Sequence, residues 1–147
     1  MNLISVDCVE FNDKRKICVA SENGKKYTLK NTSEFTIRKV KVDKCLMQAQ
    51  GERRCDYLMS VDPKDLKRVI FIELKGSRLT DAVKQLYSTI GYLKGEFIDH
   101  QLDARIVGSR DVPQIRNTPD YVKLERTVRS TNGTIIISTN KMYVENI

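Results

Sequence analysis

One stretch, RVIFIELKGSRLTDAVKQL from Arg68, constrains the fold of this chain more than any other. It opens with the apolar run 69–72, which is typical of a buried strand. After Gly76 the apolar residues recur at three- and four-residue spacing as far as Leu93, which predicts an amphipathic helix. Residues 103–109 then return to a short apolar strand pattern. A strand, a helical crossover and a strand in one sheet predict at least one parallel pair with a right-handed connection.

Turn residues divide the rest of the chain into further strands and a second helix. Asn23-Gly24 is the strongest hairpin signal in the N-terminal part. Thr118-Pro119 is typical of a helix cap followed by proline in the first turn. The predicted strands are 3–11, 15–20, 25–30, 39–47, 55–61, 69–75, 103–109 and the segment TIIIST, and the second helix covers about 119–130.

The order of these elements predicts the fold class. Thr80 is the expected N-cap of the first helix, and Gly95 is its expected stop. Several strands come first, followed by a strand–helix–strand unit and a final helix and strand. This order predicts an α/β or α+β protein, with a central mixed β-sheet flanked by helices and an N-terminal β-hairpin region.

Length and composition favour one domain over residues 1–147. The 40% hydrophobic content is enough for one core, and the 31% charged content favours a soluble protein. No apolar run approaches the roughly 18 residues that span a bilayer. The N-terminus has no basic region followed by a long apolar stretch, so we expect no secretory signal, no membrane partner and a cytoplasmic location.

The four cysteines give no sign of a zinc site, because none of them lies in a CxxC pair and the single His100 is distant in sequence. A chain of this size with its own core does not need disulfides. We therefore expect the cysteines to be small buried hydrophobic residues.

The net charge points to an anionic partner. Lysine and arginine exceed aspartate and glutamate by 26 − 19 = 7, which gives a formal charge of +7. Nucleic acid is the commonest partner of such a chain, although charge informs association and not fold.

Glu73 and Lys75 end the apolar strand, and their side chains point the same way because strand residues alternate between faces. If 55–61 and 69–75 form a hairpin, Asp56 lies opposite Glu73 and Lys75. Two alternatives are open. In the first, Glu73 and Lys75 are an ordinary surface ion pair, worth at most about 1 kcal/mol. In the second, they belong to a reaction centre held on a rigid strand.

The second alternative has a definite chemistry. Mg²⁺ takes oxygen ligands, keeps several waters and needs only one or two carboxylates, which Asp56 and Glu73 supply. A lysine beside them can orient an attacking water or neutralise developing phosphate charge. Such a site hydrolyses phosphodiesters without a histidine base.

The pattern Asp56 … Glu73-Leu74-Lys75 resembles the (P)D…(D/E)xK signature of the restriction-endonuclease-like nuclease superfamily, over about residues 39–109. The blocks KVDKCL, RCDYL, ELKG and ARIVGSR also resemble small uncharacterised bacterial proteins. The resemblance implies a restriction-endonuclease-like core. It also implies that Asp56, Glu73 and the Leu74 carbonyl bind Mg²⁺, for which Mn²⁺ can substitute, and that Lys75 is catalytic.

Three further features bear on this resemblance. Gln85 matches a glutamine that several members carry on the following helix. Cys55 stands where many members have proline. Many members also place an extra acid on an N-terminal helix, where this chain has predicted strands; the expected substitutes are Glu34, Asp43 and Glu52.

The resemblance implies an endonuclease whose partner is nucleic acid, with DNA favoured over RNA. Alternatives are an RNA-directed nuclease and an inactive nucleic-acid- or protein-binding module of the same fold. A homodimer is also open, since many single-domain nucleases of this kind pair to cut two strands. Basic residues that are expected to contact phosphates are Lys44, Arg53, Arg54, Arg78 and Arg110.

Overall fold

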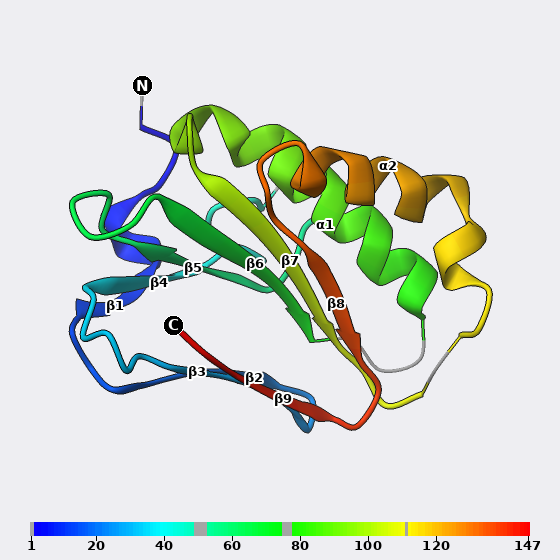
Figure 1. Cartoon of the computed structure of the whole chain (residues 1–147), viewed down its shortest axis with the longest axis horizontal. Helices are drawn as coiled ribbons and strands as arrows, with labels where there is room; N and C mark the ends of the chain where they lie inside the picture. The colour runs from blue at the N-terminus through cyan, green and yellow to red at the C-terminus, as the bar shows by residue number, and fades with distance from the viewer. Residues whose placement is uncertain (1, 49–52, 75–77, 111) are drawn as a thin grey trace.

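Two β-sheets and two helices stack in three layers in the computed structural model, which describes residues 2–48, 53–74, 78–110 and 112–147 (Figure 1). A six-stranded sheet forms the middle layer, with the strand order β1-β4-β5-β6-β7-β8. Both helices cover one of its faces, and a three-stranded sheet of order β2-β3-β9 covers the other. Helices therefore flank the central sheet on one side only.

The middle sheet is mixed, as predicted. Strands β1, β4, β5 and β6 pair antiparallel, whereas β6, β7 and β8 pair parallel. The α+β class with a central mixed sheet is thus confirmed. Its strands are β1 (Val9–Asp13), β4 (Ile37–Lys41), β5 (Tyr57–Val61), β6 (Arg68–Leu74), β7 (Gln101–Val107) and β8 (Ile135–Ser138).

The remaining elements complete the outer layers. The second sheet contains β2 (Ile17–Glu22), β3 (Lys25–Lys30) and β9 (Met142–Asn146). The α-helices are α1 (Leu79–Leu93) and α2 (Pro119–Arg129), and short 3₁₀ helices are η1 (Val6–Cys8), η2 (Lys94–Phe97) and η3 (Ile115–Asn117). Among the described residues, no helix is both long and apolar enough to cross a membrane.

The continuous apolar run of β6 follows from its place between two cores. Val69 and Phe71 pack in the core beneath the helices, while Ile70 and Ile72 pack in the core between the two sheets. Because successive side chains point to opposite faces, a strand covered on both sides needs apolar residues at every position.

Local signals set several element limits as predicted. Asn23 and Gly24 have positive φ angles of 53° and 76° and join β2 to β3, which confirms the hairpin. The Thr118 hydroxyl accepts a hydrogen bond from the Tyr121 N–H at 3.4 Å, which confirms the cap of α2. The expected cap at Thr80 is wrong, because α1 begins at Leu79.

Other predicted limits are also wrong. The strand expected over 39–47 ends at Lys41, because Lys44 adopts a φ of 63° that interrupts an extended strand. The strand expected over 3–11 begins only at Val9, after η1. The edge strand β9 was missed altogether; it pairs in parallel with β3, more than a hundred residues earlier in the chain.

The expectation for the cysteines holds for only two of them. Cys18 and Cys55 are free and buried, but Cys8 and Cys45 form a disulfide. The fold brings their Cα atoms to 5.7 Å, which is within the usual range for a disulfide. Their separation of 37 residues carries no local signal of this pairing.

A buried charge network joins the middle sheet to the second sheet. Arg105 on β7 is 3% exposed, and its Nε donates to Glu145 Oε2 on β9 at 2.7 Å. The hydroxyl of Tyr27 on β3 donates to the same oxygen at 2.7 Å. Arg105 also donates to the Thr134 carbonyl at 2.9 Å. The network therefore bonds two strands of the second sheet to β7.

Asp103, fully buried on the same face of β7, extends this network. It accepts from Arg68 Nε at 2.7 Å and from the Thr134 N–H at 2.8 Å. Burial by itself raises the pKa of Asp103, but the hydrogen bond and charge of Arg68 outweigh burial, and the pKa lies below its usual value. Asp103 is therefore held as a carboxylate, and its stabilising contribution is lost as the pH falls through its lowered pKa.

We predict that Arg105→Ala lowers the free energy of unfolding by about 3–5 kcal/mol, because it removes the nearer cation of the half-buried Glu145 carboxylate and leaves only Arg68, at 3.9 Å. Denaturant unfolding measures this change. The control is Arg129→Ala, which removes an exposed i,i+4 ion pair and should cost about 0.5 kcal/mol or less. Equal losses for the two variants would contradict the role of the network.

Candidate functional site

Asp56 and Glu73 lie side by side where β5 begins and β6 ends. The register pairs Tyr57 with Ile72. Asp56, which directly precedes β5, therefore lies opposite Glu73 near the end of β6. The Asp56 N–H donates to Glu73 Oε1 at 3.1 Å, and the Leu74 N–H donates to Asp56 Oδ2 at 2.8 Å. The two carboxylates are thus fixed by each other's strand, as the hairpin interpretation predicts.

A third carboxylate, which sequence reasoning missed, reaches this position from the second sheet. Glu22 ends β2, and its side chain contacts the Asp56 carboxyl. Glu22 Oε2 is buried and has no hydrogen-bond donor among the described residues. An acceptor buried without a donor is costly, which marks this oxygen as a candidate ligand for a cation.

Burial and negative neighbours perturb the titration of Asp56. Asp56 is 9% exposed. Removal from water raises the pKa of Asp56 to about 6; the negative charge of Glu22 also raises it, and the hydrogen bond from the Leu74 N–H opposes the rise. A carboxyl group with this pKa gains from any bound cation, since the cation stabilises its ionised form.

Helix α1 supplies Gln85 to the other side of the acids. With its amide oriented to satisfy both of its polar atoms, Gln85 Nε2 donates to Glu73 Oε2 at 2.7 Å and to the Asp81 carbonyl at 3.1 Å. Glu73 is only 2% exposed, so this contact helps to satisfy a buried carboxylate. The structure therefore brings Gln85 together with Asp56 and Glu73.

The start of β5 is also bonded to α1. Thr89 Oγ1 accepts from the Cys55 N–H and donates to the Gln85 carbonyl, each at 2.8 Å. Cys55 is fully buried, and burial raises the pKa of its thiol well above the ordinary value, so it is not suited to act as a nucleophile. Cysteine at this position packs in the core beneath the helices.

Lys75 lies outside the described residues, so its predicted place beside Glu73 stays a prediction. Among the acids expected to stand in for the extra carboxylate, Glu52 also lies outside them. Asp43 is paired with Arg54 at 2.6 Å. Glu34 sits between β3 and β4, at the far end of β3 from Glu22. The residue found beside Asp56 is instead Glu22, which only the packing of the second sheet could reveal.

The basic residues that are predicted to contact phosphates differ in exposure and in their ion pairs. Arg54 is half-buried against Asp43 and is less free to contact a ligand than expected. Arg53 and Arg78 both lie near Asp81 in the first turn of α1, at 3.8 and 3.7 Å, and both remain largely exposed. Lys44 and Arg110 are exposed.

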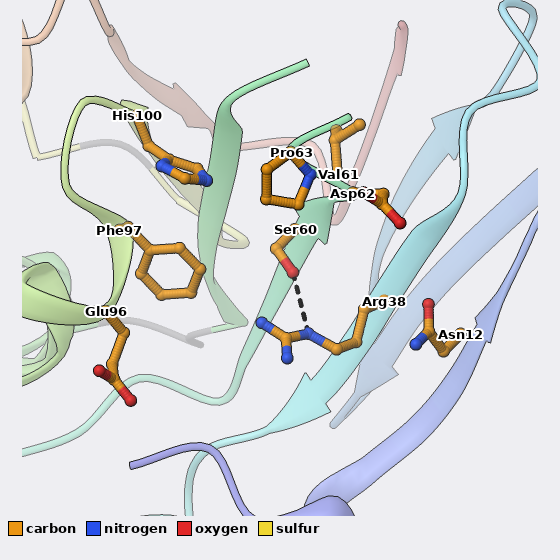
Figure 2. A pocket seen from close by; sticks show the side chains of 9 residues that line it. All are labelled: Asn12, Arg38, Ser60, Val61, Asp62, Pro63, Glu96, Phe97 and His100. Carbon is orange, nitrogen blue, oxygen red and sulfur yellow. Dashed lines mark hydrogen bonds between the residues drawn. The ribbon is translucent and has the colours of Figure 1, made fainter. Parts of the chain in front are cut away.

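A cavity of about 240 Å³ lies at the opposite end of the middle sheet (Figure 2). Arg38 Nε donates to Ser60 Oγ at 3.1 Å, and burial lowers the pKa of this guanidinium. Glu96 accepts from the Leu3 N–H, and Asp62 accepts from the Lys64 N–H. These acids have backbone donors, whereas Glu22 Oε2 has none among the described residues, so the acids around Asp56 are the stronger candidate site. The lining residues are Asn12, Arg38, Ser60, Val61, Asp62, Pro63, Glu96, Phe97 and His100.

The donors around Asp56 suit a hard cation that keeps much of its water. Within the described part of the chain, no group of three or more His, Cys, Asp or Glu side chains is arranged to hold a metal ion. Mg²⁺ does not require such a group, because one or two carboxylates, a backbone carbonyl, water and substrate phosphates can complete its coordination. The two carboxylates of Asp56 and Glu73 fit that kind of ion.

Comparison with known proteins gives no match: no family model, curated protein or solved structure is similar to the chain at a significant level.

We predict that Asp56→Asn stabilises the metal-free protein at pH 8 by on the order of 2 kcal/mol. The folded-state pKa of about 6 lies above the ordinary 3.8, so the stability that protonated Asp56 contributes is lost as the pH rises from about 4 to 6. Asparagine carries no charge and avoids this loss. Denaturant unfolding at pH 4 and pH 8 measures the difference.

The control for this comparison is Asp99→Asn, because Asp99 is exposed and its φ of 63° suits asparagine. It should leave the stability nearly unchanged at both pH values. If Asp56→Asn has the same effect at pH 4 as at pH 8, Asp56 is not an electrostatically strained carboxyl group.

Proposed function

We propose that this chain is a Mg²⁺-dependent nuclease that hydrolyses phosphodiester bonds in DNA. The observation that carries the proposal is the meeting of Asp56, Glu73 and Glu22 at one end of the strands, with a buried carboxylate oxygen that lacks a donor among the described residues. An ordinary surface ion pair would not place the buried oxygen of Glu22 beside two buried acids, because like charges at short range disfavour ionisation.

Each acid has a separate role in this proposal. Asp56 and Glu73, with the Leu74 carbonyl, bind Mg²⁺, and Mn²⁺ can take its place. The bound ion supplies Lewis-acid polarisation of the scissile phosphate and of the attacking water. Glu22 adds negative charge next to Asp56, which favours a divalent ion over a monovalent one.

Gln85 and Lys75 complete the set of reacting groups. Gln85 holds Glu73 by the 2.7 Å hydrogen bond and so orients its carboxylate. Lys75 follows Glu73 by two residues in sequence. We assign Lys75 the task of orienting the attacking water and stabilising the charge that develops on the phosphate.

Charge supports nucleic acid as the substrate. The chain carries a formal charge of +7, and Arg53 and Arg78 are exposed at the first turn of α1, next to Gln85 and the acids. We favour DNA. An RNA-directed nuclease with the same chemistry and an inactive nucleic-acid- or protein-binding module are the alternative outcomes of the test below.

We also propose that the protein works in the cytoplasm, as one chain or as a homodimer that acts on two strands. Disulfides are rare in that compartment, so Cys8 and Cys45 are expected to be reduced there.

The deciding experiment is a cleavage screen with Mg²⁺ or Mn²⁺ on linear, circular, single-stranded and branched DNA, and on RNA. Lys75→Ala should lower the cleavage rate by at least about a hundredfold, the scale expected for a lost acid–base or charge-stabilising group. The fold should stay intact, because a lysine at a strand end can be lost within about 0.5 kcal/mol.

The matched control is Lys84→Ala, since Lys84 is a half-buried lysine of α1 whose Nζ lies 3.9 Å from an Asp120 carboxylate oxygen. It should cleave at the wild-type rate. Equal cleavage by wild type and Lys75→Ala would overturn the site assignment. No cleavage of any substrate by the wild type would leave the binding module as the function.

A further inference from the structure

Three basic residues from distant parts of the chain lie on backbone segments that are bonded to one another at one end of the second sheet. Lys26 lies in β3, Arg110 follows β7, and Lys141 precedes β9. All three side chains are exposed. They are called the second basic rim below, to separate them from Arg53 and Arg78 at the start of α1.

Backbone hydrogen bonds fix the places from which these residues project. The Lys26 N–H donates to the Lys141 carbonyl at 3.0 Å, and the Lys141 N–H donates to the Gly108 carbonyl at 2.8 Å. Arg110 lies two residues after Gly108. The start of β3, the end of β7 and the start of β9 are therefore bonded into one unit. Lys141 has the positive φ of a turn residue.

The second basic rim lies at the same end of the molecule as the acids. Lys25 is the register partner of Glu22, whereas Lys26, the next residue, pairs with Ser21 and Met142 and projects from the outer face of the second sheet. Glu22 contacts Asp56, so the β2–β3 turn adjoins the carboxylates directly. Figure 1 shows this turn, the turn between β8 and β9 and the start of α1 at one end of the layers.

The charges of the second basic rim are not neutralised by the described part of the protein. Arg53, Arg54 and Arg78 each have an acidic partner. No ion pair joins Lys26, Arg110 or Lys141 to a described acid. The bonded backbone segments thus carry three exposed cations at one end of the second sheet, an arrangement that favours binding of a polyanion.

We propose that the second basic rim binds the phosphate backbone of the nucleic acid, so that the substrate contacts the second sheet as well as α1 at the end of the molecule that carries the acids. This inference rests on the proposed function and extends it: the backbone is held from the second sheet as well as from α1. Contacts to phosphates are independent of base sequence, so the rim contributes affinity and position and not sequence preference.

The test is binding of a fluorescently labelled DNA duplex to the Asp56→Asn protein, measured by anisotropy over a range of salt concentrations. Adding Lys26→Glu and Lys141→Glu should weaken binding at least about tenfold. The slope of log affinity against log salt should become shallower by about 2, one for each lost phosphate contact.

The control adds Lys64→Glu and Lys67→Glu instead, two exposed lysines between β5 and β6 at the far end of the middle sheet. It makes the same change in net charge and should leave the salt slope unchanged. Melting temperatures confirm that both variants fold. Unchanged binding by the rim variant, or equal weakening by both variants, would overturn the proposed rim.

The outcome is separable from that of the nuclease proposal. If the wild type cleaves but the rim variant binds like the control, the rim is wrong and the nuclease stands. If the wild type cleaves nothing but the rim variant alone loses binding, the nuclease proposal fails and the rim stands as a nucleic-acid surface.

Discussion

The ion pair between Arg105 and Glu145 is the interaction on which the candidate site depends. It joins the buried Arg105 to the half-buried Glu145 between the two sheets, and the Tyr27 hydroxyl bonds to the same carboxylate oxygen. The pair holds β9 and β3 against the middle sheet, and β2 is carried along by its pairing with β3. This pair and the apolar core between the sheets dock the second sheet, and the docking brings Glu22 at the end of β2 to Asp56.

The same packing explains why the acids differ electrostatically from the other charged groups of the interior. Asp103 and Glu145 have arginine partners, and the pKa of Asp103 is lowered once Arg68 outweighs its burial. Asp56 is buried beside another carboxylate, and its pKa is raised. Burial raises the pKa in both places, and at Asp103 the neighbouring arginine reverses the direction of the shift. A metal ion would supply at Asp56 the positive charge that arginine supplies at Asp103.

The sequence predicts the middle of this structure better than its edges. The apolar run of β6, the helical period of α1 and the return to β7 are strong local patterns, and the antiparallel hairpin that places Asp56 opposite Glu73 follows from them. Glu22, β9 and the Cys8–Cys45 disulfide could not be predicted, because each depends on contacts between segments far apart in the chain. β9 is also a half-exposed edge strand, so its alternation gives a weak signal.

The central claim is that Asp56 and Glu73 bind a divalent metal ion. Anomalous diffraction from crystals soaked in Mn²⁺ tests it directly, because it locates the ion without reference to activity. The account predicts one peak within about 2–2.5 Å of carboxylate oxygens from both Asp56 and Glu73, and no peak there in Asp56→Asn crystals. No peak at these residues at saturating Mn²⁺, or a peak bound only by other acids, would contradict the claim.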